Sequence, residues 1–285
     1  MEQFTTELVS ICIPTYNSAR YIKSTIQSVL NQTYSTLEII ICDDNSSDNT
    51  LEIVKSLNDS RITIHVSPQN HGITANWNAS VEKCSGMYVK LLCADDILKP
   101  DCIEKQIAVF HADILKSISL VVCSSTVIDY KDTVLFNRKR ILPSGLQNSK
   151  KAISKSIFFG TNIIGEPMVG LFRRSDFGVE CVFDGLNPYL IDLDFWVKLL
   201  QKGPLYFIPE HLASFRISSE SISSSLNIKQ YLLFCSYSIT LYKQKQIPLV
   251  SLLFGIFNSF FIAIIRNLIF LKGRLHSKYI SKQTN

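Results

Sequence analysis

The chain reads Leu8-Val-Ser-Ile-Cys-Ile-Pro-Thr-Tyr-Asn17 near its start and Leu37-Glu-Ile-Ile-Ile-Cys-Asp-Asp-Asn-Ser-Ser-Asp48 shortly afterwards. Each stretch is a short apolar run that stops abruptly in polar residues, which is typical of a buried strand followed by a loop. Between the two runs, residues 19–31 place their apolar side chains at helical spacing. A strand, a helix and a strand in this order predict two parallel strands joined by a crossover helix.

The same alternation continues along the chain. Further helices are predicted at residues 50–58, 72–83, 101–115 and 190–201, and further strands at 61–66, 87–93, 169–172 and 205–208. Residues 124–190 are otherwise irregular, and we interpret them as the second half of the same domain. The pattern therefore predicts an α/β fold, in which a mostly parallel sheet is flanked by helices on both faces.

The composition excludes several classes of protein. Of the 285 residues, 46% are hydrophobic, which supplies a sizeable core and excludes a disordered chain. The eight cysteines form no C-x-x-C pair, which argues against a zinc ribbon or a thioredoxin-like site, and we expect reduced thiols in a cytosolic protein. The start of the sequence, Met1-Glu2-Gln3, lacks the apolar segment of a signal peptide, which favours the same compartment.

Charge is distributed unevenly along the chain. All 24 acidic residues lie at or before Glu220, whereas residues 221–285 carry eight basic side chains and no acidic one. Because a nucleic-acid-binding protein would be more uniformly basic, we expect no nucleic-acid partner. We interpret the chain as a slightly acidic domain, residues 1–225, followed by a basic and apolar helical tail, residues 226–285.

The tail contains a long uncharged stretch, Gln246 to Ile265, which is long enough to span a bilayer. Within and just after it, Ser251, Asn258 and Arg266 recur at helical spacing and form one narrow polar stripe. The stripe favours a helix that lies on an anionic membrane surface, with its apolar face buried in the membrane and the stripe turned outward. A helix packed on the domain or on a partner, and a helix that spans the membrane, are the alternatives.

Polar residues cluster where three predicted strands end. The clusters are Thr15-Tyr16-Asn17, Asp43-Asp44 with Asp48, and Asp95-Asp96. Open α/β sheets bind ligands at the carboxyl ends of their strands. Several carboxylates would repel an anionic ligand unless a divalent cation lies between them, so Mg²⁺ or Mn²⁺ with a nucleoside diphosphate fits this pattern. The sequence has neither a P-loop nor a dinucleotide-binding glycine motif.

The motifs around these clusters resemble those of the family 2 inverting glycosyltransferases, which have the GT-A fold. The matching stretches are Val9–Asn17, Asp43–Asp48, Asn70–Gly72, Asn78, Gly86–Tyr88, Asp95–Leu98, Asp192–Trp196 and Phe215–Arg216. They follow the family's order and cover roughly residues 8–220. The resemblance is specific because several motifs occur together at plausible spacings.

The resemblance implies a role for each matching polar residue. Asp43 or Asp44 accepts a hydrogen bond from the base or ribose of the nucleotide. The metal ion is held by Asp95 and Asp96, and Asp192 is the general base that takes the proton of the acceptor hydroxyl. The nucleotide-binding set implied in this way is Thr15, Asn17, Asp43, Asp44, Asn70, Asn78 and Asp95.

The sequence also departs from the family pattern. Cys93 stands where the metal motif often has its first Asp, and Ile191 stands where a Glu often precedes the base. Trp77 replaces a frequent Arg, and Ser218 replaces a His that often follows the aromatic-Arg pair. These departures leave open which of the two acids, Asp95 or Asp96, binds the metal. Structural explanations also exist for single acids, since Asp192 lies near a helix start and Asp48 precedes one.

The resemblance implies a metal-dependent enzyme that moves a sugar, with inversion, from a UDP- or dTDP-linked donor to a glycan hydroxyl. Together with the tail, it suggests a lipid-linked acceptor in cell-surface polysaccharide or O-antigen assembly, at the cytoplasmic face of the inner membrane. Two other classes remain open. One is a catalytically inactive nucleotide-sugar-binding protein, and the other is a nucleotidyltransferase, which also uses paired Asp residues and a metal ion.

Overall fold

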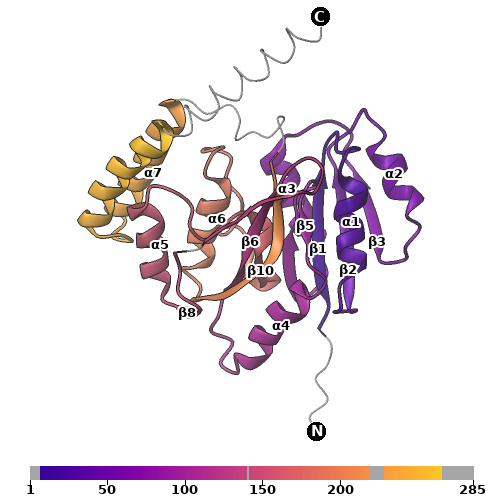
Figure 1. Cartoon of the computed structure of the whole chain (residues 1–285), viewed down its shortest axis with the longest axis horizontal. Helices are drawn as coiled ribbons and strands as arrows, with labels where there is room; N and C mark the ends of the chain where they lie inside the picture. Colours follow the sequence, from indigo (N-terminus) through magenta and orange to yellow (C-terminus); the bar gives the residue numbers. More distant parts are fainter. Residues whose placement is uncertain (1–6, 140, 218–227, 265–285) are drawn as a thin grey trace, which may run out of the picture. The chain divides into compact units, whose positions relative to one another are not determined.

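The computed structural model describes residues 7–139, 141–217 and 228–264 (Figure 1). The strands are β1 (Val9–Thr15), β2 (Leu37–Asp43), β3 (Ile62–Val66), β4 (Tyr88–Leu91), β5 (Ile97–Leu98), β6 (Leu120–Ile128), β7 (Val134–Asn137), β8 (Gly145–Gln147), β9 (Gly170–Arg173) and β10 (Leu205–Arg216). The helices are α1 (Ile22–Leu30), α2 (Thr50–Ser56), α3 (Ile73–Glu82), α4 (Cys102–Ala112), α5 (Ser149–Phe158), α6 (Ile191–Leu199) and α7 (Ile228–Lys243). A further helix covers residues 249–264, and short 3-10 turns form η1 (Pro167–Val169) and η2 (Arg174–Asp176).

The strands of the described chain form one ten-stranded sheet in the order β3-β2-β1-β4-β9-β6-β10-β5, with β7 on β6 and β8 on β10. Parallel pairing joins β1 to β2 and β4, β2 to β3, and β6 to β10. Strand β9 is antiparallel to both β4 and β6, so β6 and β10 run in the same direction as β1 to β4. The prediction of a mostly parallel sheet flanked by helices is confirmed.

Strand β6 is the longest of the strands that the sequence analysis did not assign, which also include β5, β7 and β8. Its apolar run is interrupted by Ser124, Ser125 and Thr126, yet all of its residues are buried. The hydroxyl of Ser124 donates to the carbonyl oxygen of Arg138, and that of Thr126 donates to Oδ1 of Asn137. Partners on and beside β7 therefore allow hydroxyls to stand in a buried strand. The predicted strand at 205–208 likewise continues to Arg216 along β6.

A buried lysine fixes the segment that leads from the sheet towards α6. Lys90 on β4 is 0% exposed, and its Nζ donates to the carbonyl oxygens of Met168 at 2.7 Å and Gly170 at 2.9 Å. A buried ammonium group needs such partners, because an unpaired one would be very costly. The indole Nε1 of Trp196 on α6 donates to the Gly165 carbonyl at 2.7 Å. These bonds hold η1 against β4 and the 165–170 segment against α6.

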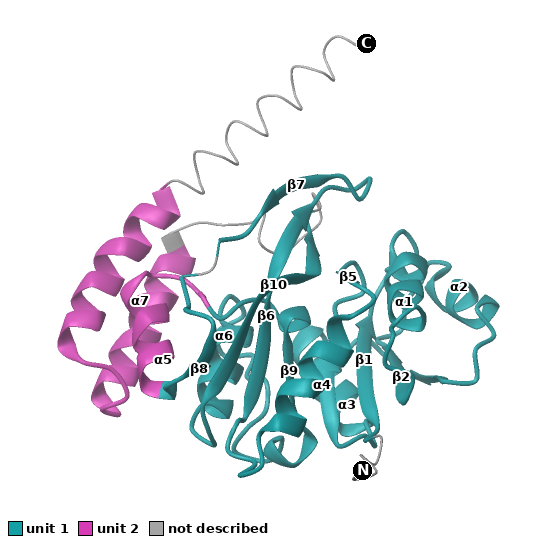
Figure 2. Cartoon of the chain, turned by 60° about the horizontal axis from the view of Figure 1, so that its bottom comes forward, with its two compact units in different colours: residues 1–149, 164–217 teal, residues 150–163, 218–285 magenta. Residues whose placement is uncertain are grey.

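The chain divides into two compact units (Figure 2). The first comprises residues 7–149 and 164–217, apart from residue 140, and carries the sheet. The described part of the second comprises residues 150–163 and 228–264, which form three helices. Most of α5, which lies in the middle of the sequence, thus groups with the C-terminal helices rather than with the sheet.

The polar stripe predicted in the tail lies inside the second unit. Ser251 and Ser259 are only 6% and 5% exposed, and Nδ2 of Asn258 donates to the Phe158 carbonyl on α5 at 2.7 Å. The expectation that Ser251 and Asn258 turn outward is therefore wrong, because small polar side chains allow close approach to α5. Arg266 lies outside the described residues. Within the described ranges, no helix has both the length and the hydropathy needed to cross a membrane.

Glycine is required where β9 passes the ring of Trp196. A Cβ on Gly170 would lie 2.5 Å from that ring, which is 1% exposed and held by its own hydrogen bond. We expect Gly170→Ala to lower the free energy of unfolding by about 1–3 kcal/mol through overpacking. Urea unfolding measures the change. Gly178→Ala is the matched control, since its Cβ would meet no atom within 4 Å, and an equal loss in both variants would contradict the overpacking argument.

Candidate functional site

The predicted site residues gather at one edge of the sheet. Strands β1, β2 and β4 run in the same direction, so Thr15, Asp43 and the Asp95-Asp96 pair all stand at or beyond the carboxyl ends of these strands. Strands β6 and β10 end at the same edge, which brings Arg216 to it as well. The topology therefore assembles one polar region from segments that are far apart in the sequence.

Asp43 is the buried centre of the β1–β2 half of this region. It is 0% exposed, and its Oδ2 accepts hydrogen bonds from Thr15 Oγ1 at 2.9 Å and from Ser46 Oγ at 2.6 Å. Its Oδ1 accepts a bond from the Ser46 backbone N–H at 2.8 Å. Each carboxylate oxygen has two lone-pair positions, so these bonds orient Asp43 and leave it room to accept another donor.

The loop after β1 is held to the loop after β2. Asn17 adopts a positive φ of 49°, and its Oδ1 accepts a bond from the Ser47 backbone N–H at 2.8 Å. Oδ2 of Asp48 accepts from the Ala19 N–H, and its Oδ1 accepts from the N–H and hydroxyl of Thr50 at the start of α2. Burial alone would raise the pKa of Asp48, but these hydrogen bonds outweigh it and hold that pKa below its usual value. Asp48 therefore tethers the loop and caps α2.

Asp44 organises the start of α3. Its carboxylate accepts hydrogen bonds from the backbone N–H groups of His71 and Gly72, and Asn70 Oδ1 accepts a second bond from Gly72 at 2.9 Å. Gly72 has a φ of 87°, which suits glycine at this turn. Asp44 and Asn70 thus fix the backbone between β3 and α3.

Two asparagines on α3 hold the walls of the site. Asn76, which the sequence analysis missed, donates from Nδ2 to the carbonyls of Thr15 and Cys42 at the ends of β1 and β2. Asn78 donates to the Phe183 carbonyl and accepts from the Phe183 N–H, both at 2.9 Å. The two bonds of Asn78 imitate a strand pairing and tie the 183 segment to α3. A polar residue at the buried position of Asn76 is the signal that could have identified it.

Arg216 connects the acid pair to the neighbouring strands. It is 1% exposed; its backbone N–H donates to Asp96 Oδ1 at 3.1 Å, and its Nε donates to the Asp95 carbonyl at 2.8 Å. Its Nη1 donates to the Asp129 carbonyl and forms an ion pair with Asp132 in the turn after β6. The guanidinium also lies over the ring of Tyr21, 4.4 Å from its centroid. Sequence reasoning noted Arg216 as part of a motif but gave it no role, and it missed Tyr21.

The acid pair is largely buried, and burial disfavours its ionised form. Asp96 is 1% exposed, and its Oδ2 has no hydrogen-bond partner among the described residues. Burial raises the pKa of Asp96 well above its usual value, and the charge of Asp95 raises it further. Burial likewise raises the pKa of Asp95. Two adjacent carboxyl groups that resist ionisation are a place where a cation would be favourable.

Asp192 lies close to this pair. Burial raises the pKa of the Cys93 thiol well above its usual value, and the charges of Asp96, Asp95 and Asp192 all raise it further. Asp192 is half-buried in the first turn of α6, where its Oδ1 accepts a bond from the Leu193 N–H at 2.8 Å. Burial and the charges of three acids from two segments thus all favour the protonated form of this thiol.

The acid pair fits a single divalent cation that takes part of its shell from a substrate. Over the described ranges, no group of three or more His, Cys, Asp or Glu residues is arranged to hold a metal. The unpartnered Oδ2 of Asp96, next to Asp95, supplies the oxygen chemistry that Mg²⁺ and Mn²⁺ prefer. Phosphate oxygens and water would complete such a shell.

An open, mostly parallel sheet with polar residues at the ends of three strands, and carboxylates at two of these ends, is typical of nucleotide-binding α/β enzymes. Residues 10–177 match the family model described as Glycosyl transferase family 2, and the chain belongs to this family. It is 39% identical over 206 residues to the chondroitin synthase of Escherichia coli, covering 70% of this chain and 28% of that protein. It is 31% identical over 224 residues to an uncharacterized glycosyltransferase of Rickettsia prowazekii, covering 77% and 67%.

The match to the hyaluronan synthase of Pasteurella multocida is 45% identical over 108 residues, which is 37% of this chain and 11% of that enzyme. The chain therefore spans only a small part of the two polysaccharide synthases. Among solved structures, Staphylococcus aureus TarS with UDP-GlcNAc has a TM-score of 0.62 at 17% identity, covering 82% of this chain and 66% of TarS. A mannosyltransferase of Pyrobaculum calidifontis with GDP-Man and Mn²⁺ has a TM-score of 0.60 at 13% identity, covering 98% and 79%. These similarities confirm the GT-A fold.

The raised pKa of Asp96 leads to a stability test that needs no metal. When a carboxyl group has a higher pKa in the folded than in the unfolded state, the free energy of unfolding of the protein falls as pH rises from the unfolded pKa towards the folded pKa. Asn keeps the shape of Asp96 and an acceptor for the Arg216 N–H, but carries no charge. We expect Asp96→Asn to raise the free energy of unfolding by about 1–3 kcal/mol at pH 8, with a smaller gain at pH 5. Urea unfolding in metal-free buffer measures both.

Asp129 is the control, because its pKa is shifted in the opposite direction from that of Asp96. Hydrogen bonds from the N–H groups of Thr133 and Lys131 hold the pKa of Asp129 below its usual value. Asp129→Asn should therefore leave stability unchanged or lower it at pH 8. If Asp96→Asn were less stable than the natural chain at pH 8, the acid pair would be compensated within the protein itself.

Proposed function

We propose that the chain is a metal-dependent inverting glycosyltransferase that uses a UDP- or dTDP-linked sugar and a glycan hydroxyl as acceptor. The single observation that carries the proposal is the Asp95-Asp96 pair beyond the end of β4, where the buried Oδ2 of Asp96 has no hydrogen-bond partner among the described residues. The pair suits a cation and a diphosphate, and Asp192, whose charge raises the pKa of the neighbouring Cys93, suits a proton acceptor. The relatives named chondroitin synthase and hyaluronan synthase support a role in making a polysaccharide.

The donor nucleotide would lie against the ends of β1 and β2. The base or ribose donates a hydrogen bond to Asp43, whose orientation is fixed by Thr15 and Ser46. A donor from the nucleotide to an ionised carboxylate forms a charge-assisted bond. Asn17, Asp44, Asn70 and Asn78 act on the nucleotide through the loops that they hold. Because these loops are tied to one another, little ordering would remain to be done when the donor binds.

Asp95 and Asp96 would hold Mg²⁺ or Mn²⁺. When bound, the cation supplies positive charge that stabilises the departing nucleoside diphosphate. Arg216 keeps both acids in place through its backbone N–H and Nε. Cys93, which stands in place of the first Asp of the motif, lies next to the pair, and the proposal assigns the protein's ligands to the two acids.

Asp192 would act on the acceptor. It takes the proton of the acceptor hydroxyl while that oxygen forms its bond to the anomeric carbon of the sugar. The bond from this carbon to the diphosphate oxygen breaks in the same step, and its electron pair leaves with the nucleoside diphosphate. Attack from the face opposite the leaving group inverts the anomeric centre. The first turn of α6 and the Trp196 bond to Gly165 hold Asp192 for this role.

The acceptor in this proposal is lipid-linked, as in cell-surface polysaccharide or O-antigen assembly, and the enzyme works at the cytoplasmic face of the inner membrane. The support is the uneven charge of the chain, since residues 221–285 carry eight basic and no acidic side chains. Such a segment is attracted to anionic lipids at about 1 kcal/mol per charge near the surface. The attraction would bring the catalytic unit to an acceptor that stays in the membrane.

The proposed base gives the sharpest test of activity. We expect Asp192→Asn to lower the rate of sugar transfer by about 10²-fold or more, because the amide cannot take a proton, while donor affinity is kept. Asp194→Asn is the matched control on the same helix turn, since Asp194 pairs with Lys198 at 2.6 Å. Transfer is followed by release of the nucleoside diphosphate. Normal transfer by a folded Asp192→Asn variant would place the base on another residue.

The proposed metal site gives a separate test by calorimetry of donor binding. We expect binding to need Mg²⁺ or Mn²⁺ and to be lost with a chelator, because the diphosphate otherwise faces two carboxylates. Asp95→Ala and Asp96→Ala should remove the dependence, whereas Asp59→Asn, at a surface ion pair with Arg61, should not. Donor binding without any turnover in the presence of Mn²⁺ would instead support an inactive nucleotide-sugar-binding protein.

A further inference from the structure

One face of the second unit is apolar and exposed. The side chains on the helix at 249–264 that form it are between 39% and 60% exposed: Leu249, Val250, Leu253, Phe254, Phe257, Phe260, Phe261 and Ile264. We call these eight residues the apolar face. They recur every three or four positions, so they follow one side of the helix over four turns. Exposed apolar patches of this extent mark an interaction site.

The opposite side of the same helix is fully engaged. Asn258 donates to the Phe158 carbonyl, and a Cβ on Gly255 would lie 2.3 Å from the Ile157 carbonyl oxygen. Phe254, at the border of the apolar face, also stacks on Phe158 with ring centroids 5.0 Å apart. The helix is therefore seated on α5 by its small and polar residues and by one ring at the border of the apolar face. Its orientation is fixed, and the apolar face is the side that remains outside.

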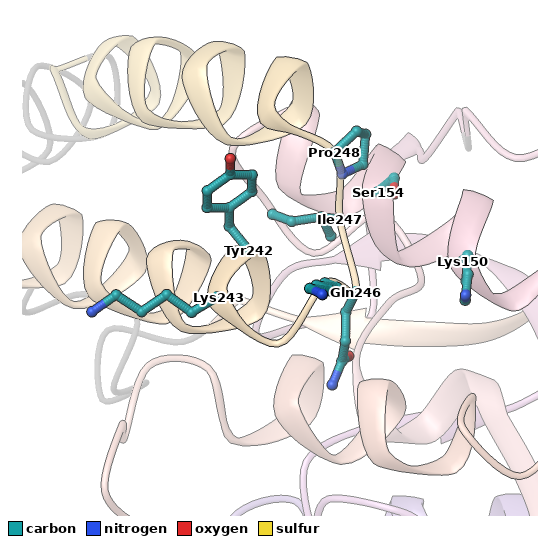
Figure 3. Close-up of a pocket in the computed structure, with 8 residues that line it drawn as sticks. Lys150, Ser154, Tyr242, Lys243, Gln246, Ile247 and Pro248 are labelled. Carbon is teal, nitrogen blue, oxygen red and sulfur yellow. The ribbon is translucent and has the colours of Figure 1, made fainter.

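Lysines border the near end of the apolar face. A cavity of about 550 Å³ lies at the turn before this helix and is lined by Lys150, Ser154, Tyr242, Lys243, Lys245, Gln246, Ile247 and Pro248 (Figure 3). The three lysines are exposed. No charged residue occurs between Lys245 and Arg266, so the helix itself is uncharged up to the end of its described part. An uncharged apolar face next to exposed lysines is the pattern of an interfacial helix.

The charges decide between the candidate occupants of this face. A second copy of the chain would bring another segment with eight basic and no acidic side chains against the first, which is unfavourable. An anionic bilayer offers hydrocarbon for the phenylalanines and phosphate groups for the lysines. Burial of apolar area and attraction of charge then act together.

We propose that the apolar face inserts into the headgroup boundary of an anionic lipid bilayer, with Lys150, Lys243 and Lys245 contacting lipid phosphates at its near end. The proposal deepens the proposed function, on whose membrane location it rests, by naming the residues that touch lipid and the whole helical unit that carries them. Ser251 and Asn258 of the polar stripe pack inside the unit instead of facing water.

The test is co-sedimentation of the full-length chain with vesicles of phosphatidylcholine alone or mixed with phosphatidylglycerol. We expect the natural chain to bind the mixed vesicles and to bind them less at high salt. Phe257→Gln combined with Phe261→Gln should weaken binding by about tenfold or more, because two exposed rings lose their apolar burial. Ile114→Gln combined with Leu115→Gln is the matched control, since these side chains are 90% and 87% exposed in the other unit.

The charge contribution is tested by Lys243→Gln combined with Lys245→Gln. We expect weaker binding to the mixed vesicles, by roughly fivefold per lysine, and no change on phosphatidylcholine alone.

In a third variant, Phe257→Trp, brominated acyl chains should quench the new indole, which reports insertion directly in a folded chain. Calorimetry of nucleotide-sugar binding with Mn²⁺ is run on every variant. Loss of vesicle binding with intact donor binding concerns the apolar face alone, whereas absence of donor binding in the natural chain would contradict the proposed function.

Three results would overturn the inference. One is a natural chain that stays in the supernatant with mixed vesicles at low salt. Another is equal vesicle binding by the natural chain and the double phenylalanine variant. The third is a dimer in sedimentation velocity that the double phenylalanine variant abolishes while vesicle binding is unchanged, which would assign the apolar face to a second copy.

Discussion

The site depends on one buried arginine at the end of a strand. Arg216 closes β10, and its backbone N–H, Nε and Nη1 reach the loop after β4 and the turn after β6. They add to the antiparallel pairing of β5 with β10, which also ties the segment after Asp96 to the far half of the sheet. A guanidinium suits this position because its fixed fork of donors can satisfy several carbonyls at once. The geometry of the acid pair is therefore a property of the sheet and not of the loop alone.

The buried carboxylates of Asp43 and Asp96 differ in how completely hydrogen bonds compensate them. Around Asp43, both carboxylate oxygens accept hydrogen bonds, from Thr15 at the end of β1 and from Ser46 in the loop after β2, which favours a rigid pocket. Around Asp96, one carboxylate oxygen is buried without a partner, and burial raises the pKa of both acids. The first arrangement stabilises the folded chain, and the second disfavours the ionised acids in the absence of a cation. In the function proposed above, the first would hold the nucleotide and the second the metal ion.

The second unit follows the opposite rule from a soluble helical bundle. Its helix at 249–264 uses Ser251, Asn258 and Ser259 to pack and leaves phenylalanines outside. Small polar residues allow helices to approach closely, and their hydroxyl and amide groups find partners on the neighbouring helix or on their own. In water this arrangement leaves apolar area exposed. At a lipid surface the polar side chains still pack against α5, and the phenylalanines are buried in lipid as well. Because polar residues of this helix pack inside and apolar residues lie outside, helical spacing alone predicted the wrong orientation for Ser251 and Asn258.

The sequence alone determined the alternation of strands and helices, the strand ends at which acids gather, and the family motifs, because these depend on local periodicity and on polar residues that follow apolar runs. It did not reveal β6, whose hydroxyls are acceptable in the core only because partners on and near β7 accept their hydrogen bonds. Nor did it reveal that α5 joins the C-terminal helices, that Asn76 links two strand ends, or that Arg216 holds the acid pair. These features depend on contacts between segments far apart in the chain, and local spacing carries no information about which segments meet.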